Sequence, residues 1–189
     1  MKYYSLIYNG NDAVDKNHIV CQEILNDDNP DYTVCTGKKV DNWNSNITLV
    51  CNDPSETVVP DWISQPNGWF VVSKRFVEAV SNLENGAIQY LPVKIDACQP
   101  QMQSEEYFVA NVIEVLDAVD FDNSVYFMLF QNEPSIIKYA LKGEIIKNHH
   151  IFMVKEAILS LSIFVSEDFK KAVRKAKLSG FSFTEVKVV

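Results

Sequence analysis

The chain has 189 residues, of which 47% are hydrophobic and 22% charged, a composition that excludes bulk disorder and indicates a folded, soluble protein. A chain of this length buries roughly 70% of its unfolded surface, so it needs no metal or disulfide to hold a core. The net charge is −8, and residues 1–68 carry ten acidic against four basic side chains. This balance disfavours nucleic acid and anionic membranes as partners, since phosphate contacts need lysine and arginine.

The sequence shows no targeting signal, and we expect a cytoplasmic protein. The stretch Met1–Gly10 has too short an apolar core and no cleavage pattern for a signal peptide. No uncharged apolar run approaches the ~20 residues that span a bilayer, so no membrane partner is expected. The cysteines stand too far apart for a CxxC redox or zinc motif, and we expect them to be free and buried. They are Cys21, Cys35, Cys51 and Cys98.

Residues 1–60 are predicted to form an acidic, β-rich N-terminal lobe. Short β-branched or aromatic runs alternate there with turn residues, which is typical of strands joined by turns. Two prolines and an Asn-Gly pair between residues 59 and 68 then predict a break. A second domain is expected over residues 61–189, with one compact domain as the alternative. The strands expected in the lobe are Tyr3–Tyr8, Tyr32–Cys35 and Ile47–Cys51, and one helix is expected around Asn17–Leu25.

A strand-helix-strand unit is predicted over residues 69–95. An apolar run leads into Ser73, which is a good N-cap residue for the helix that follows. From Phe76, apolar residues recur at the i, i+3, i+4 and i+7 positions of one helix face. Asn85-Gly86 is a helix stop, and a strand resumes after it. Pro92 in that strand is expected at a sheet edge or a bulge.

A second unit with the same order of elements is predicted over residues 162–188. Ser166 is its N-cap, Phe169 begins its helix face, and Gly180 stands in the turn before the last strand. We therefore assign structural roles to Ser73, Phe76, Ser166, Phe169 and Gly180. Seven identities at a constant offset of 93 residues suggest a repeated β-α-β architecture. They are Val72, Ser73, Phe76, Ala79, Val80, Val93 and Lys94, matched by Val165, Ser166, Phe169, Ala172, Val173, Val186 and Lys187.

More strands are predicted between the two units. The strongest is Tyr107–Leu116, and an acidic bend over Asp117–Asp122 follows it. The sequence thus predicts an α+β fold with a mixed, mostly antiparallel sheet, two or three short helices and two similar strand-helix-strand units. The shorter predicted strands are Val125–Phe130, Ile136–Leu141, Ile151–Val154 and Ile158–Leu161.

Candidate catalytic groups are few and isolated. His149 and His150 are adjacent on a predicted strand, so their side chains point to opposite faces and do not easily share a metal or a substrate. Cys98 has no Cys/His motif around it, and Ser73 and Ser166 lack the Gly-x-Ser-x-Gly pattern of a nucleophile elbow. We predict a protein that is not an enzyme and has no cofactor or metal site. The alternative is a small hydrolase or transferase that uses Cys98 or His149/His150.

The charged clusters are explained better by folding than by ligand binding. The acidic residues of Asp117–Asp122 lack the residue pattern of a calcium loop. The helix after Ser166 begins with Glu167 and Asp168 and ends in lysines, which is the order that the helix dipole favours. Neither a Walker A loop nor a dinucleotide fingerprint is present.

Several stretches, most of them in the two units and the strands between them, together resemble one family of bacterial proteins. They resemble the eleventh numbered immunity-protein family of bacterial polymorphic toxin systems, over about residues 61–189. The stretches are Asp61-Trp62, Gly68–Ser73, Phe76, Tyr90–Ile95, Tyr107–Val112, Asp117–Asp120, His150–Phe152, Phe164–Ser166, Phe169, Ala172, Gly180, Phe181 and Phe183.

The resemblance implies a cytoplasmic antidote that is made beside a toxin and binds its toxic domain. Such an inhibitor needs a complementary surface and no reactive group. The acidic N-terminal lobe would suit a basic toxin domain through electrostatic steering. A regulatory or scaffold domain is the remaining alternative, and the oligomeric state does not follow from the sequence. The contact residues expected in the lobe are Asp27, Asp28, Asp31, Asp41 and Trp43.

Overall fold

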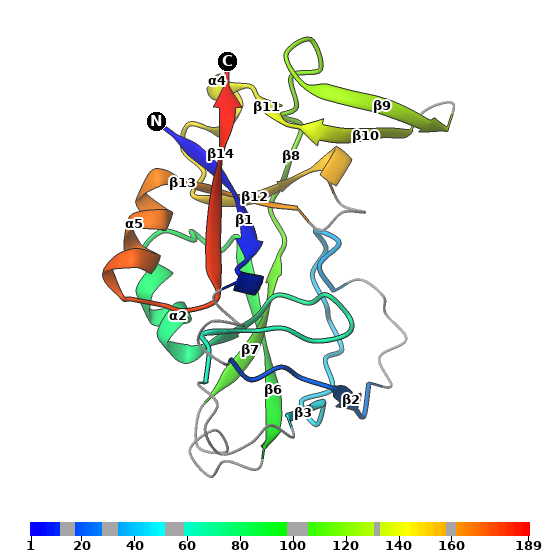
Figure 1. Cartoon of the computed structure of the whole chain (residues 1–189), viewed down its shortest axis with the longest axis vertical. Helices are drawn as coiled ribbons and strands as arrows, with labels where there is room; N and C mark the ends of the chain where they lie inside the picture. The colour runs from blue at the N-terminus through cyan, green and yellow to red at the C-terminus, as the bar shows by residue number, and fades with distance from the viewer. Residues whose placement is uncertain (12–17, 28–33, 52–58, 98–105, 131–132, 158–161) are drawn as a thin grey trace.

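The protein is described by a computed structural model over residues 1–11, 18–27, 34–51, 59–97, 106–130, 133–157 and 162–189. The strands form two six-stranded sheets, called sheet A and sheet B, and a separate two-stranded hairpin. With the three short helices of the described residues, this is the predicted α+β class. Figure 1 shows sheet A in the upper part of the molecule and sheet B in the lower part.

Both sheets mix strands from distant parts of the chain. Sheet A has the order β11-β14-β1-β13-β12-β8, and sheet B has the order β2-β3-β6-β7-β5-β4. In sheet A the bounds, in that order, are Ala140–Leu141, Phe181–Val188, Tyr3–Tyr8, Ile163–Ser166, Ile151–Val154 and Val115–Leu116. In sheet B they are Glu23–Leu25, Thr48–Cys51, Ile88–Ala97, Tyr107–Val112, Val71–Ser73 and Trp62–Ile63.

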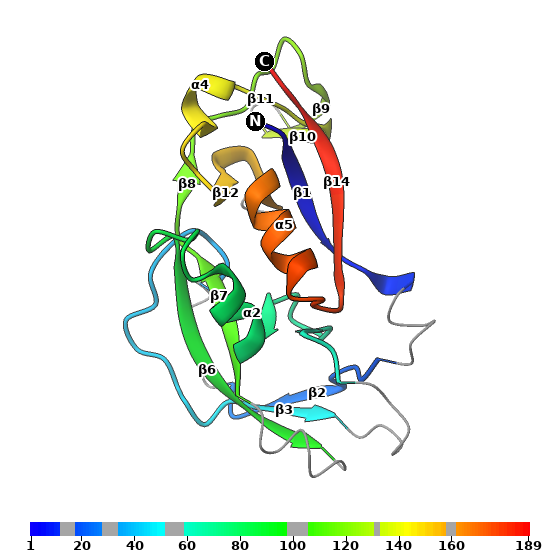
Figure 2. The ribbon, with the colours of Figure 1, turned by 90° about the vertical axis from the view of Figure 1, so that its left-hand side faces the viewer.

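Two helices pack together in the middle of the molecule. These are α2 (Lys74–Val80) and α5 (Glu167–Lys175), and Figure 2 shows them from the side they cover. The shorter elements are α4 (Gly143–Ile146) and the 3-10 turn η1 (Lys155–Ala157). The hairpin of β9 (Val125–Phe130) and β10 (Glu133–Lys138) projects from the end of the molecule that holds sheet A (Figure 1).

The two sheets repeat one arrangement of five strands. Strands β11-β14-β1-β13-β12 of sheet A correspond to β3-β6-β7-β5-β4 of sheet B. In both sets the first pair is parallel and the next three pairs are antiparallel. The unit β5-α2-β6 therefore corresponds to β13-α5-β14, which are the two units that the sequence predicts. In each unit, a third strand lies between the two strands.

That third strand comes from the other half of the chain. The first half contains β1 to β6 and the second contains β7 to β14, yet β7 lies between β5 and β6, and β1 lies between β13 and β14. The registers agree, because Ser73 lies opposite Tyr107 and Ser166 lies opposite Tyr3. We call this arrangement the reciprocal strand exchange. Neither half can complete its own sheet without the other.

The domain boundary expected at residue 60 stays a prediction. In the structure, strands that precede residue 60 pair with strands that follow it. β1 pairs with β13 and β14, and β3 pairs with β6. Backbone hydrogen bonds within both sheets thus join the N-terminal lobe to the rest of the chain.

An N-cap serine starts each of the two main helices. The Oγ atoms of Ser73 and Ser166 accept hydrogen bonds from the backbone N–H three residues later, at 3.3 and 3.2 Å. Each serine also bonds to the side chain of the residue just before the neighbouring strand. Ser73 Oγ donates to Asp61 Oδ1 at 2.6 Å, and Ser166 Oγ lies 2.8 Å from His150 Nδ1. These bonds fix where each helix leaves its sheet.

The buried carboxylate of Asp61 also connects the two units. It accepts hydrogen bonds from Ser179 N–H at 2.9 Å and Ser179 Oγ at 3.3 Å, and Arg75 Nη1 lies 3.2 Å away. Ser179 and Gly180 form the turn between α5 and β14. Gly180 has φ +87°, and a Cβ there would lie 3.0 Å from Trp62 Cβ. The turn therefore requires glycine for both its conformation and its close approach to β4.

The central core joins the helices of both units to both sheets. Phe76 and Phe169, at matching positions of α2 and α5, are fully buried, and their ring centroids lie 5.9 Å apart in edge-to-face contact. Phe181 of β14 stacks on Phe76 with centroids 5.4 Å apart. The same cluster includes Val72 of sheet B and Val165 of sheet A. The predicted helix faces are therefore core faces, and they meet each other.

Long connections cover the other face of each sheet. Over sheet B, the cross-strand pair Gln89 and Asn111 holds the loop between β2 and β3. Asn111 Nδ2 donates to Lys38 O at 2.7 Å, and Gln89 Nε2 donates to Val40 O at 2.8 Å. Over sheet A, the segment between β8 and β11 buries Val119 in a second cluster.

Local predictions for the N-terminal lobe need correction. The helix expected around Asn17–Leu25 is wrong, because Glu23–Leu25 is strand β2 and pairs with β3. The strand expected at Tyr32–Cys35 is wrong at its described end, where residues 34–37 form a turn and Cys35 has φ +63°. Pro92 pairs only with β7, because β3 begins opposite Lys94, so it lies at a local edge as expected. The strand predicted at residues 158–161 lies outside the described residues.

Replacement of either core phenylalanine should destabilise both units at once. We expect Phe169→Ala to lower the free energy of unfolding by about 3–5 kcal/mol, because it removes a fully buried ring that contacts the opposite helix. Phe76→Ala should cost a similar amount, and the double variant should cost less than the sum because the two rings touch. Chemical denaturation measures this. A loss below about 1 kcal/mol for both single variants would show that these rings are not core.

Candidate partner-binding surface

The β9–β10 hairpin exposes a continuous set of large apolar side chains. Five successive residues of β9, from Val125 to Leu129, are each between 41% and 56% exposed, and Ile137 of β10 is 62% exposed. Successive side chains of a strand point to opposite faces, so both faces of β9 are apolar and exposed. An uncharged run of this kind normally belongs to a strand covered on both sides.

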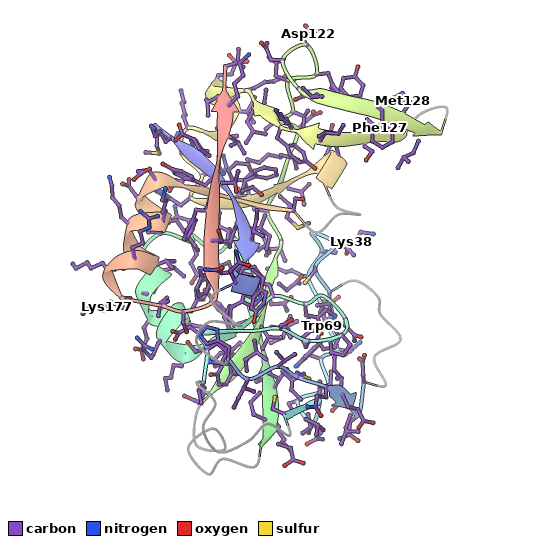
Figure 3. All side chains as sticks on the ribbon, in the orientation of Figure 1. Lys38, Trp69, Asp122, Phe127, Met128 and Lys177 are labelled. Atoms are coloured by element: carbon purple, nitrogen blue, oxygen red, sulfur yellow. The ribbon has the colours of Figure 1, made fainter. Side chains whose placement is uncertain are left out.

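This clustering distinguishes the hairpin from single exposed apolar residues elsewhere. Scattered apolar side chains are normal on protein surfaces, whereas contiguous ones mark interaction sites. Figure 3 shows Phe127 and Met128 on the projecting hairpin, and Asp122 at the tip of the turn beside it. We therefore take the hairpin as the candidate partner-binding surface.

The base of the hairpin is held firmly. Ser124 Oγ donates to Asp120 O at 2.6 Å and accepts from Ala140 N–H at 2.9 Å, so the two ends of the hairpin are tied to one hydroxyl. The rings of Phe121 and Tyr126 meet edge to face with centroids 5.2 Å apart. Ile136 packs on the buried cluster of sheet A. The apolar surface is thus presented by an anchored element.

Charged side chains of both signs lie at the base of the hairpin. Asp122 is exposed in the turn before β9, whereas Lys138 ends β10 opposite Val125. Asp117 pairs with Lys155 at 2.8 Å, and this hydrogen bond lowers the pKa of the Asp117 carboxyl below its ordinary value. The hairpin is therefore an apolar surface with a border of mixed charge.

The sequence-predicted acidic contacts that the structure describes are exposed on the N-terminal lobe. Asp27 is exposed after β2, and its Oδ2 accepts a hydrogen bond from Asn67 Nδ2 at 2.9 Å. Asp41 is exposed on the loop held by the Gln89–Asn111 pair. Asp28 and Asp31 lie outside the described residues. The structure does not bring Asp27 and Asp41 into one hydrogen-bonded group.

Trp43, the fifth predicted contact, is partly committed to packing. Its Nε1 donates to Pro92 O at 2.7 Å, and its ring meets Trp69 edge to face with centroids 5.8 Å apart. It packs against the buried cluster on the outer face of sheet B. Trp43 therefore holds the loop that carries Asp41, and only part of its ring is exposed.

The groups of the enzymatic alternative have separate partners. His149 Nδ1 lies 2.8 Å from Glu114 Oε1, and His150 Nδ1 lies 2.8 Å from Ser166 Oγ. Cys98 lies outside the described residues. Within the described ranges, no group of three or more His, Cys, Asp or Glu side chains is placed to hold a metal ion.

The remaining cysteines are buried thiols. Cys21, Cys35 and Cys51 are buried, as the sequence predicts. A hydrogen bond from Cys51 lowers the pKa of the Cys21 thiol, whereas burial raises the pKa of Cys35. In the part of the chain that the structure describes, no helix has the length and apolar character to cross a membrane.

Sequence reasoning identified β9 as a strand but missed it as a surface. The run Val125–Phe130 is apolar at every position, and such a run predicts a strand buried on both faces. Whether a neighbour covers a strand depends on long-range packing, which periodicity does not record. One feature of the sequence could have indicated the exposed surface. The uncharged strand directly follows an acidic, turn-rich bend, and such a bend is typical of the protein surface.

Comparison with known proteins places the chain among the immunity proteins. The model of the immunity protein family Imm11 matches residues 3–188. The chain therefore belongs to the Imm11 family. This match also covers the N-terminal lobe, which the resemblance over residues 61–189 left out. A search of the curated proteins found no match.

Exposed hairpin residues should be dispensable for stability. We expect Phe127→Thr and Ile137→Thr each to change the free energy of unfolding by about 0.5 kcal/mol or less, because threonine keeps the β propensity and little burial is lost. Chemical denaturation measures this, with Val72→Thr in the core as the destabilising control. If the two hairpin variants cost as much as the control, the hairpin is part of the core.

Proposed function

We propose that this protein neutralises a cognate bacterial toxin by binding its toxic domain, without catalysis of its own. The observation that carries the proposal is the exposed apolar hairpin on a chain of the Imm11 family. In this proposal the protein belongs to a polymorphic toxin system, acts in the cytoplasm and protects the cell that makes the toxin. Neither a cofactor nor a metal is required.

The chemistry of the hairpin fits a protein partner. Hot spots of protein interfaces are enriched in aromatic residues that lose their water contact on binding. Tyr126 and Phe127 are such residues, and Met128 adds an adaptable apolar side chain between the aromatic and aliphatic ones. The charged side chains at the base of the hairpin would form a polar rim around this apolar centre.

The acidic N-terminal lobe has a second part in the proposal. Asp27, Asp28, Asp31 and Asp41 would attract a basic toxin domain over a distance, with Trp43 at the edge of the contact. Long-range attraction of this kind raises the association rate more than it raises the affinity. Salt weakens it, since the Debye length falls to ~10 Å at 0.1 M ionic strength.

The test uses the C-terminal domain of the protein encoded in the adjacent reading frame. We expect it to bind the immunity protein in calorimetry and to be harmless to cells that co-express the wild type. Phe127→Thr together with Met128→Thr should weaken binding at least tenfold and remove protection, because the apolar centre is lost. The matched control is Ile7→Thr, which replaces an apolar β-strand residue of similar exposure away from the hairpin.

Two results would contradict the proposal. Failure of the wild-type protein to bind or protect would contradict the function itself. Equal binding by the hairpin double variant and by Ile7→Thr would contradict the assigned surface. An association rate that does not change between low and high salt would remove the steering role of the acidic lobe.

A further inference from the structure

In the part of the chain that the structure describes, β9 forms an open sheet edge. Among the described residues it pairs only with β10, and Figure 1 shows it as the outer strand of the hairpin. β10 lies close to η1, so the other edge of the hairpin is flanked by the protein itself. The backbone N–H and C=O groups on the outer side of β9 are therefore available to another strand.

β9 differs from the other edge strands that the structure describes. The outermost strands of sheets A and B, β11, β8, β2 and β4, have two or three residues each, whereas β9 has six. The longer stretches that β11 and β3 leave unpaired on β14 and β6 contain Glu185 and Pro92. Short edges, charges and prolines are the common ways by which proteins prevent unwanted strand pairing. The β9 sequence, Val125–Phe130, is long and contains neither a charged residue nor a proline. A long edge strand without charges or proline is open to pairing, so we expect it to have a specific partner strand.

Pro134 identifies which backbone groups face outward. It lies opposite Met128, and proline has no N–H, so this cannot be a hydrogen-bonded pair of the hairpin. Hydrogen-bonded and non-bonded pairs alternate along an antiparallel ladder. Tyr126, opposite Ile136, is therefore also a non-bonded position. The N–H and C=O groups of Tyr126 and Met128 point to the free edge.

The family distinguishes between the two kinds of strand that could pair there. A second copy of this chain would bring its own hairpin, whose base carries both Asp122 and Lys138, so charge neither opposes nor favours that pairing. The chain belongs to the Imm11 immunity family, which implies a toxin as the partner. The family thus favours a strand of a different protein, the toxin domain.

We infer that β9 takes up an apolar edge strand of the toxin domain, so that the hairpin and the toxin share one sheet of at least three strands. This inference rests on the proposed function. Isolated two-stranded sheets are marginal, and a third strand would satisfy the open backbone groups of Tyr126 and Met128. Side chains of Phe127 and Leu129 would then provide specificity.

Hydrogen exchange on the full-length protein tests the shared sheet directly. The probe is the C-terminal domain encoded in the adjacent reading frame. We expect the amides of Tyr126 and Met128 to exchange at least tenfold more slowly in the complex than in the free protein. If the complex forms and these two amides keep their free exchange rates, the inference is overturned while the proposed function stands.

A pair of variants at one position separates backbone from side-chain contacts. Met128→Ala removes the side chain and keeps the edge N–H, whereas Met128→Pro removes both and mirrors Pro134 across the ladder. We expect Met128→Pro to weaken toxin binding at least tenfold more than Met128→Ala. Equal losses would overturn the inference. Melting temperatures show whether Met128→Pro stays folded, and if it unfolds, the exchange rates of the wild type decide.

Two further results of these experiments would contradict the inference in different ways. A wild-type protein that forms dimers by itself, and that Met128→Pro converts to monomers, would assign the edge to a second copy and overturn the inference. Absence of any complex between the wild-type protein and the toxin domain would overturn the proposed function, and the inference with it. Light scattering of the free protein and calorimetry of the mixture distinguish these two results.

Discussion

The reciprocal strand exchange is the constraint on which the rest of the structure depends. β1 completes the sheet of the second half, and β7 completes the sheet of the first half. The two halves are therefore bonded through backbone ladders in addition to side chains, and each helix is positioned by a sheet that contains a strand of the other half. The contact between Phe76 and Phe169 follows, because the matching helices emerge toward each other. Each sheet is therefore complete only with a strand from the other half of the chain.

The sequence predicts the parts of this architecture and not their assembly. Ser73 and Phe76 reappear as Ser166 and Phe169 at an offset of 93, because a capped amphipathic helix needs those residue types at that spacing. The exchanged strands do not share this offset: Tyr3 and Tyr107, which take the same register positions, lie 104 residues apart. Which of two distant strands pairs with a given strand depends on how much surface each pairing buries. Local sequence patterns do not contain this information. The helix expected around residues 17–25 failed similarly, since pairing with β3 decided its conformation.

The candidate surface follows from how this platform is covered. The helices lie over the central core, and the connection between β8 and β11 closes the outer face of sheet A. The hairpin belongs to that connection, yet only its base reaches the sheet, through Ile136 and the Ser124 hydroxyl. The apolar side chains of β9 therefore stay exposed and are not part of the core. The acidic residues that composition singled out are real surface charges at Asp27 and Asp41, whereas Trp43 is bound to Pro92 O. Composition shows which part of the sequence is charged. Only the three-dimensional structure shows which apolar strand stays exposed to solvent.

The central claim is that a self-sufficient platform presents a separable binding element. The most direct measurement replaces residues 125–138 by a short glycine-asparagine turn between Ser124 and Tyr139, whose neighbour Ala140 already bonds to the Ser124 hydroxyl at 2.9 Å. Thermal unfolding and calorimetry with the toxin domain are then recorded for this variant and the wild type. The account predicts a variant that stays folded, with a melting temperature lowered only by the loss of the Ile136 contact, and that shows no measurable binding of the toxin domain. A folded variant that binds the toxin domain with wild-type affinity would contradict it.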